Sequence, residues 1–192
     1  MEFLHDDIYI EQVLNGNTKA FAFLVDKYKV LVYTVAFRIL RNHEDTEEIV
    51  QDAFVKAYHA LDSFEKKSKF STWLHRIVYN SAISKTRKKK LETNPLDDFL
   101  IENYSIDNTF ENLDELTHEE QKTLLDVLIS KLDPEESAII SMYYISDHST
   151  DEIAEITGLS QSNVKVKLHR IRAKLQVYLK QYLKKNISKI QT

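Results

Sequence analysis

The sequence predicts an all-α protein, and three observations carry that prediction. Its 192 residues include only two glycines and two prolines, whereas a β-sheet protein needs turn residues every ~8–12 positions. Apolar residues, 43% of the chain, recur at helical spacing along most of it. Residues that favour helix N-caps precede several of these apolar stripes. We therefore expect two small helical domains joined by an acidic linker, the C-terminal one a helix-turn-helix.

The domain boundaries follow from the charge. Residues 1–90 carry 15 Lys and Arg against 12 Asp and Glu, residues 91–120 carry none against 10, and residues 121–192 carry 11 against 8. The middle segment is polar and contains Pro95, as is typical of a linker. These blocks predict an N-terminal domain over 1–90, an acidic linker over 91–120 and a C-terminal domain over 121–192.

Three helices are expected in the N-terminal domain. Apolar residues spaced by threes and fours predict the first over 20–40. An acidic start favours a second helix over 45–61. Ser71 is a suitable N-cap for a third, which ends in a basic run at 85–90.

The C-terminal domain carries a series of helix start and stop signals. Asp133 is the expected N-cap of one helix, and Ser149 with Glu152 predicts a capping box at the start of a short one. Gly158 can adopt the left-handed conformation that ends a helix. Ser160 then caps a long last helix.

Residues 150–175 have the order of a helix-turn-helix, which reads duplex DNA with its second helix. From Val164 onward there are nine Lys and Arg and no acid, and such unmixed charge is typical of a polyanion-binding surface. An ordinary helical hairpin with a basic surface is the alternative. The residues expected to face or flank a DNA groove are Ser162, Lys165, Val166, Lys167, His169, Arg170 and Arg172.

A second nucleic-acid site is indicated where residues 63–70 and the following helix mix cations with aromatics. A flat ring can stack on an unpaired base while lysines hold its backbone. Judged singly, Phe70 and Trp73 fit a plain core role better. The candidates for binding single-stranded DNA are the rings of Phe64, Phe70, Trp73 and Tyr79 and the cations Lys66, Lys67, Lys69, Arg76 and Arg87.

The helix over 45–61 presents a polar outer face that includes Glu48, Gln51, Asp52 and Lys56. This face fits solvated surface and a docking site for a basic partner equally well.

Several function classes are disfavoured. Without cysteine there is no disulfide or thiolate metal site, and the Glu-x-x-His pairs Glu2/His5 and Glu115/His118 lie in a tail and in the linker rather than on facing core helices. No nucleophile, base and orienting group converge. We therefore expect no enzyme activity, no cofactor, no metal and no membrane insertion, and a cytoplasmic location.

Three stretches together resemble a bacterial sigma factor of the extracytoplasmic-function (ECF) group. Residues 44–58 are similar to that family's core-polymerase-binding helix. Residues 60–64 and 70–80 are similar to the region that melts and reads the minus-ten promoter element. Residues 163–175 are similar to the minus-thirty-five recognition helix.

The resemblance implies a cytoplasmic bacterial factor that binds core RNA polymerase and promoter DNA, directs transcription initiation and has an anti-sigma factor as a partner. It adds Ser63 and Asn80 to the minus-ten candidates. It assigns the polymerase contact to Asp45, Glu48, Gln51, Asp52 and Lys56.

The sequence departs from the family pattern at several positions, and these departures concern the promoter sequence rather than the function. Ser84 stands where many members carry an acid, Ser162 and Asn163 replace a frequent Gly-Thr pair, and Val166 replaces a frequent serine. The alternative function is a stand-alone dimeric helix-turn-helix regulator, which would bind operators without polymerase.

Overall fold

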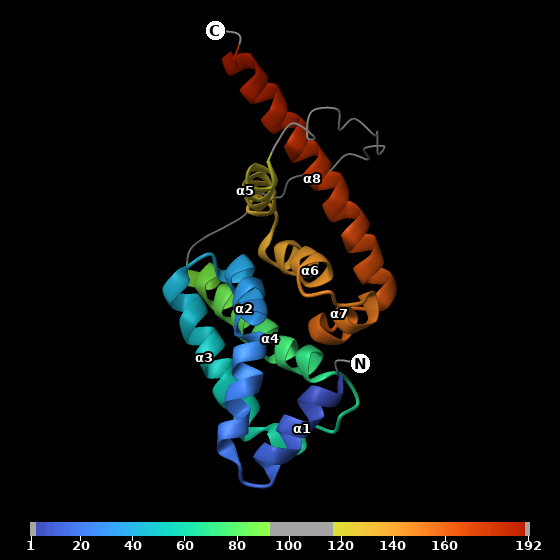
Figure 1. Cartoon of the computed structure of the whole chain (residues 1–192). Coiled ribbons are helices and arrows are strands. Elements are labelled where there is room, and N and C mark those ends of the chain that lie inside the picture. Colours follow the sequence, from blue (N-terminus) through green and yellow to red (C-terminus); the bar gives the residue numbers. More distant parts are fainter. Residues whose placement is uncertain (1–2, 93–116, 191–192) are drawn as a thin grey trace.

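The computed structural model describes residues 3–92 and 117–190. Within these ranges every regular element is a helix and no strand occurs, so the all-α prediction is confirmed (Figure 1). The helices are α1 (Phe3–Leu14), η1 (Thr18–Ala20), α2 (Phe21–Leu40), α3 (His43–His59), η2 (Leu61–Ser63), α4 (Phe70–Glu92), α5 (His118–Ile129), α6 (Pro134–Tyr144), α7 (Thr150–Thr157) and α8 (Gln161–Ile190).

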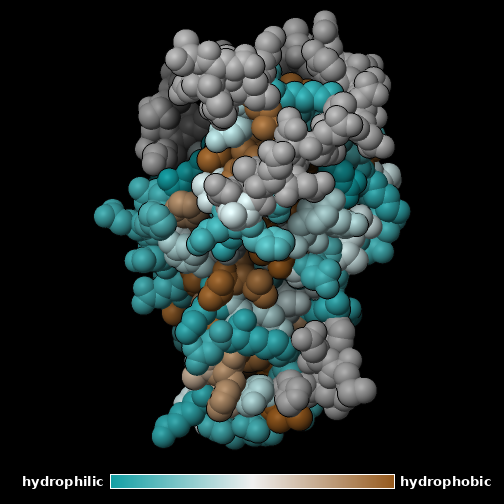
Figure 2. Space-filling view, turned by 45° about the horizontal axis from the view of Figure 1, so that its top comes forward, coloured by the Kyte–Doolittle hydropathy of each residue, from teal (hydrophilic) through white to brown (hydrophobic). Residues whose placement is uncertain are grey.

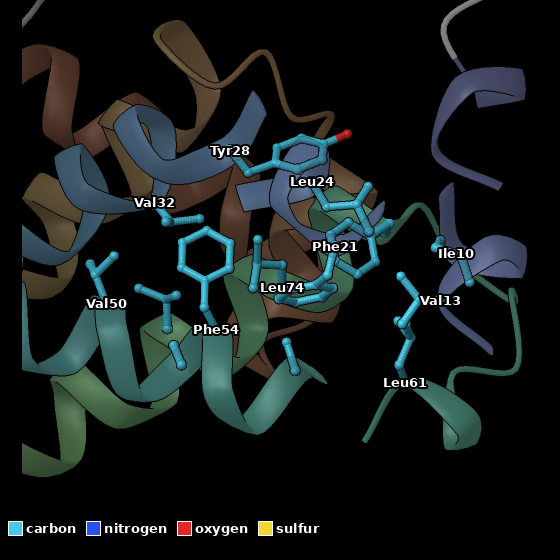
Figure 3. Close-up of a cluster of buried hydrophobic side chains, with 14 of the residues drawn as sticks. Ile10, Val13, Phe21, Leu24, Tyr28, Val32, Val50, Phe54, Leu61 and Leu74 are labelled. Carbon is cyan, nitrogen blue, oxygen red and sulfur yellow. The ribbon is translucent and has the colours of Figure 1, made fainter. Parts of the chain in front are cut away.

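Helices α1 to α4 form the N-terminal bundle, in which α2 packs against both α3 and α4 while α1 crosses its lower end (Figure 1). Leu24 and Val32 of α2 and Leu74 of α4 have no exposed surface. Figure 3 shows these side chains converging with Phe54 of α3 and Ile10 of α1. Burying such side chains contributes most of the stability of a small bundle.

Helices α5 to α8 form the C-terminal bundle, along one side of which the long helix α8 runs (Figure 1). Val164, Leu168 and Ile171 of α8 point inward and are buried. Helix α7 begins at a capping box between Ser149 and Glu152 and ends at Gly158 with φ of 75°, so both signals are confirmed.

The two bundles pack against each other along a shared apolar core, which we call the seam. Val35 and Ile39 of α2 and Tyr79 of α4 lie in one buried cluster with Ile139 of α6 and Ile153 of α7. Helix α2 packs against α6, and α4 packs against α7. The sequence predicted two units and gave no indication of whether they are in contact.

Polar groups also cross the seam. The Arg38 guanidinium of α2 pairs with Asp126 of α5, and Arg41 donates a hydrogen bond to the Leu132 carbonyl oxygen. Arg41 has a φ of 52°, the left-handed conformation that ends α2. The end of α2 is therefore positioned by contacts with the other bundle.

Three local details differ from expectation. Helix α1 was not predicted, because its buried positions Ile10 and Val13 form too short a stripe. Helix α4 begins at Phe70, so Ser71 lies inside the helix instead of capping it. Asp133 is the N-cap of α6, but its side chain makes no capping hydrogen bond.

On the face that Figure 2 shows, most of the coloured surface is hydrophilic, with apolar patches between the polar side chains. Within the described part of the chain, no helix combines the length and the apolar character that a membrane span requires.

Candidate nucleic-acid interface

The outer face of α8 is open and positively charged. Ser162, Lys165, His169 and Arg170 are exposed, and Val166 keeps 47% of its surface exposed. These residues lie opposite the buried stripe of Val164, Leu168 and Ile171, as a helix with 3.6 residues per turn requires. A face with two cations and one small apolar side chain suits a major groove, where arginine reads guanine and methyl groups meet thymine.

Three other cations of α8 reach toward α6 instead. Lys167 Nζ lies 3.4 Å from a Glu135 carboxylate oxygen, and Lys174 Nζ donates to Glu136 at 2.7 Å. Arg172 Nε donates to the Tyr144 hydroxyl at 3.0 Å, with its guanidinium 5.7 Å from that ring centroid. Lys167 and Arg172, both predicted to contact DNA, therefore also hold α8 onto α6.

The 63–70 turn joins η2 to α4 and exposes its lysines. Ser63 Oγ donates to the Ala60 carbonyl at 2.7 Å, which closes the turn at its first residue. Lys66 takes a left-handed conformation with φ of 55°, so the chain reverses there before entering α4. Lys67 is the most exposed of the three lysines of the turn, and among the described residues it pairs with Glu65 of the same turn.

An aromatic cluster lies behind the turn. The Phe64 ring centroid is 5.0 Å from that of Trp73 and 5.9 Å from that of Phe70. Phe70 is 3% exposed and belongs to the bundle core, whereas Phe64 and Trp73 are half-buried. In this arrangement Phe64 and Trp73 still present ring surface on which a base could stack, and Phe70 supports them from below.

Helix α4 has three distinct faces. Its core face carries Leu74, and its third face is open. Its seam face carries His75 and Tyr79, so the ring of Tyr79, predicted to stack on a base, is instead buried between the bundles. Trp73, Arg76, Asn80 and Arg87 follow the spacing of one helical stripe, and the last three are exposed. The exposed single-strand candidates of α4 therefore lie on one face of the helix that follows the turn.

The predicted polymerase-binding residues lie on the outer side of α3. Asp45 and Glu48 both pair with Lys85 of α4, at 2.8 and 2.7 Å, and these hydrogen bonds raise the pKa of the Lys85 ammonium. Gln51 and Asp52 are exposed. Lys56 is exposed as well, with its Nζ 3.5 Å from Ser81 Oγ.

Carboxylates surround the 63–70 turn, and no pattern in the sequence indicated them. Lys66 Nζ lies 3.1 Å from a Glu11 oxygen and 3.5 Å from an Asp7 oxygen, both in α1. The hydrogen bond to Glu11, opposed by partial desolvation, raises the pKa of Lys66. Lys69 Nζ lies 2.9 Å from Glu152 of α7, across the seam.

The described residues contain no group of His, Asp and Glu side chains arranged to hold a metal ion. Of the two sequence pairs that matched a carboxylate-histidine spacing, Glu2 and Glu115 lie outside the described residues, as does the side chain of His5.

Comparison with known proteins gives matches over both bundles. The family model for Sigma-70 region 2 matches residues 24–92, and that for Sigma-70 region 4 matches residues 122–175. The ECF RNA polymerase sigma factor SigW of Bacillus subtilis is 34% identical over 177 residues, which cover 89% of this chain and 95% of that protein. The chain belongs to the ECF RNA polymerase sigma factors. The family predicted from three sequence stretches is therefore confirmed.

Other relatives of this sigma factor agree. The ECF RNA polymerase sigma-E factor of Escherichia coli K12 is 29% identical, with 89% of this chain and 92% of that protein covered. The solved structure of CnrH bound to the cytosolic domain of CnrY has a TM-score of 0.66 and 27% identity, with 92% and 97% of the two chains covered. The sigma factor RpoE bound to the anti-sigma factor NepR from Bartonella quintana has a TM-score of 0.58 and 26% identity, with 82% and 96% covered.

Proposed function

We propose that this sigma factor divides promoter recognition between two surfaces. It binds core RNA polymerase and directs it to promoters, as its family does. In our proposal, the N-terminal domain over 1–90 holds the melted minus-ten strand, and the C-terminal domain over 121–192 reads the minus-thirty-five duplex through α8. The segment 91–120 joins them. The alternative of a stand-alone dimeric regulator is not favoured.

The observation that carries this proposal is the separation of two unlike surfaces. The outer face of α8 is a rigid helix face with exposed Lys165, Val166 and Arg170, suited to the regular geometry of duplex DNA. The turn and the open stripe of α4 instead combine ring surface from Phe64 and Trp73 with flexible cations, suited to unstacked bases.

We assign the contact with polymerase to α3 because of the side chains on its outer face. A row of polar side chains containing exposed Gln51 and Asp52 runs along a helix whose opposite side is anchored by buried Ala53 and Phe54. A rigid polar face of this kind suits docking onto a basic surface of a large partner.

An anti-sigma factor is supported as a further partner, because the two solved structures named above are complexes, and RpoE is bound there to the anti-sigma factor NepR. This chain has an apolar hollow of about 790 Å³ between α5, α6 and α8. Exposed Leu125, Tyr144 and Ile145 line it. Such a hollow supplies the apolar contact that an amphipathic helix of a partner needs.

Run-off transcription tests the proposed function directly. Purified core polymerase is incubated with genomic fragments, with and without this chain, and transcript start sites are mapped. We expect discrete new start sites that require the chain. Failure to give core polymerase any start-site selectivity would contradict the proposal.

The recognition face makes a specific prediction about two arginines of α8. Replacing Arg170 with Ala should weaken binding to the preferred minus-thirty-five duplex by about 1–3 kcal/mol and relax sequence preference, because its side chain can reach base edges. Arg172→Ala should leave sequence preference unchanged, since that guanidinium stacks over Tyr143 and Tyr144. Competition binding of holoenzyme to duplexes with single base changes measures both. Equal loss of preference in the two variants would mean that the recognition face is misassigned.

A further inference from the structure

The hollow between α5, α6 and α8 leaves a large apolar surface uncovered. Leu125, Tyr144 and Ile145 line it with exposed side chains. A small buried cluster that joins α5 to α8 through Leu128 and Leu179 forms another part of its lining. A contiguous apolar surface of this kind marks a place where another segment or molecule binds.

Part of the hollow lies beyond the residues that match the family. The family model for region 4 ends at residue 175, whereas α8 continues to Ile190. Gln176 and Leu179, which line the hollow, belong to this continuation. The region 4 match therefore does not say what covers the hollow.

One rim of the hollow is cationic. Among the described residues that line it, Arg172 alone is charged. Gln176 follows one turn later on α8, and Lys180 one turn after that, so the three residues form a row along the helix. Arg172 and Lys180 are exposed and lie about 12 Å apart along the helix axis. A segment with apolar side chains on one face and acids beside them would match this surface.

The chain itself supplies such a segment next to the hollow. Residues 93–116 lie outside the described part of the chain, and Gln121, in the first turn of α5, already lines the hollow. Ile106, Phe110 and Leu113, which we call the anchors, recur in the sequence at positions i, i+4 and i+7. This is the spacing by which an amphipathic helix places apolar side chains in a groove.

An acid follows each anchor in the sequence. Asp107, Glu111 and Asp114, which we call the acidic row, repeat the anchor spacing one residue later. In a helix they would form a line about 10 Å long beside the anchors, comparable to the distance between Arg172 and Lys180. Residues 91–120 contain no Lys or Arg, so the segment brings no like charge to this rim.

The connection to α5 is short enough to favour an intramolecular contact. Residues 115–117 separate the acidic row from α5, and a connection of this length is ordinary between two packed helices. A short covalent connection raises the effective concentration of the segment at the hollow to the millimolar range. Docking therefore needs only weak affinity to be populated.

We propose that residues 106–113 dock as an amphipathic helix in this hollow, with the anchors in the apolar groove and the acidic row on Arg172 and Lys180. Docking shortens the free connector from residues 93–116 to residues 93–105, from about 80 Å to about 45 Å of extended chain. A helix of a partner cannot occupy the hollow at the same time, so the segment competes with the anti-sigma contact proposed above. The docking itself involves only this chain and does not depend on that contact.

Disulfide trapping tests the docking, because the chain contains no cysteine. Thr109→Cys lies beside the anchors and leaves them in place. It is paired either with Leu125→Cys, on the hollow, or with Val127→Cys, on α5 but not among the residues that line the hollow. Leu125 and Val127 are 48% and 40% exposed, and the two closed loops differ by only two residues, so an undocked segment gives nearly equal yields.

In glutathione buffer we expect at least about 5-fold more intramolecular disulfide from the pair that includes Leu125→Cys. Equal yields from the two pairs would overturn the proposal.

A second measurement uses the apolar dye anilinonaphthalene sulfonate on the full chain. Ile106→Ser/Phe110→Ser removes two anchors, and Phe99→Ser/Leu100→Ser is the matched control, with two apolar residues removed outside the pattern. The first variant should raise dye fluorescence about 3-fold, because the hollow opens, and the control should not. Adding Leu125→Glu/Ile145→Glu to the first variant should abolish the increase, since charge is then placed in the hollow.

Two results of these experiments contradict the docking. If the anchor variant binds no more dye than its control, the segment does not cover the hollow. If the wild type sediments as a dimer and Leu125→Glu/Ile145→Glu as a monomer, a second copy of the chain covers it instead. Both measurements use the free chain without DNA, polymerase or an anti-sigma factor, so they leave the proposed function to its own test.

Discussion

Lowering the pH from 7 to 5 should cost the folded protein about 2 kcal/mol of stability through His75 alone. His75 is 1% exposed in the seam, and burial, with a smaller contribution from His148, lowers its pKa from 6.5 to about 3. In the unfolded chain the imidazole binds a proton at its ordinary pKa. This contribution is therefore complete above pH 6.5 and is lost as the pH falls toward 3.

The hydrogen bonds of His75 explain why its charged form is unfavourable. Nδ1 lies 2.8 Å from the Ser71 carbonyl oxygen, an acceptor, so Nδ1 carries the proton. Nε2 is buried and has no hydrogen-bond partner in the part of the chain that the structure describes. A second proton would be added there, in an apolar seam and against another imidazole.

The charged groups around His75 and His148 do not change the direction in which the two pKa values shift. His148 Nδ1 lies 3.9 Å from Glu152. Burial lowers the pKa of His148 and Lys69 lowers it further, whereas Glu152 and Asp147 raise it, and the net shift is downward. Both histidines therefore oppose protonation, and His148 adds to the loss of stability in acid.

Urea denaturation at pH 7 and pH 5 measures this effect when it is compared across variants. His75→Phe keeps an aromatic side chain in the seam and removes the titrating group, so its loss of stability between the two pH values should be about 2 kcal/mol smaller than that of the wild type. His169→Gln, at an exposed position of α8, should retain the wild-type pH dependence. An unchanged pH dependence in His75→Phe would contradict the burial of a neutral imidazole in the seam.

The residue pattern predicted those helices whose apolar residues form one stripe. For α2 the predicted range 20–40 and the observed Phe21–Leu40 differ by one residue. Helix α7 began and ended where Ser149 and Gly158 indicated, since capping is a local interaction. Helix α1 was missed because part of its contact with α2 is polar and adds nothing to an apolar stripe. Its buried Asp6 accepts hydrogen bonds from Lys27 and Tyr28 of α2.

The seam could not be predicted because periodicity identifies a buried face without identifying its partner. Val35 and Ile39 continue the same pattern as the bundle-core residues of α2, yet they pack against the other bundle. Likewise, the helical wheel indicated the direction in which Lys167 and Arg172 leave α8 but not where their long side chains end. In the structure Lys167 pairs with Glu135, and Arg172 donates a hydrogen bond to Tyr144.

Replacing Leu74 with Ala should lower the free energy of unfolding by about 2–5 kcal/mol, because it removes buried carbon atoms from a site that cannot fully collapse. Leu74 has no exposed surface, and Figure 3 shows its side chain among those of α2 and α3. Domains of this size are typically stable by only about 5–15 kcal/mol, so this change removes a large fraction of the total. Leu125→Ala is the matched control: at 48% exposure it should cost at most about 0.5 kcal/mol.

Trp73, the single tryptophan of the chain, adjoins Leu74 and provides a fluorescence probe of unfolding for the N-terminal bundle. Circular dichroism at 222 nm reports helix in both bundles. Because the seam joins the two bundles through a shared core, the two probes should give one coincident urea transition in the wild type, and Leu74→Ala should shift both to lower urea together. If the variant shifts the Trp73 transition but leaves a separate helical transition at the wild-type midpoint, the bundles unfold independently and the seam contributes little to their stability.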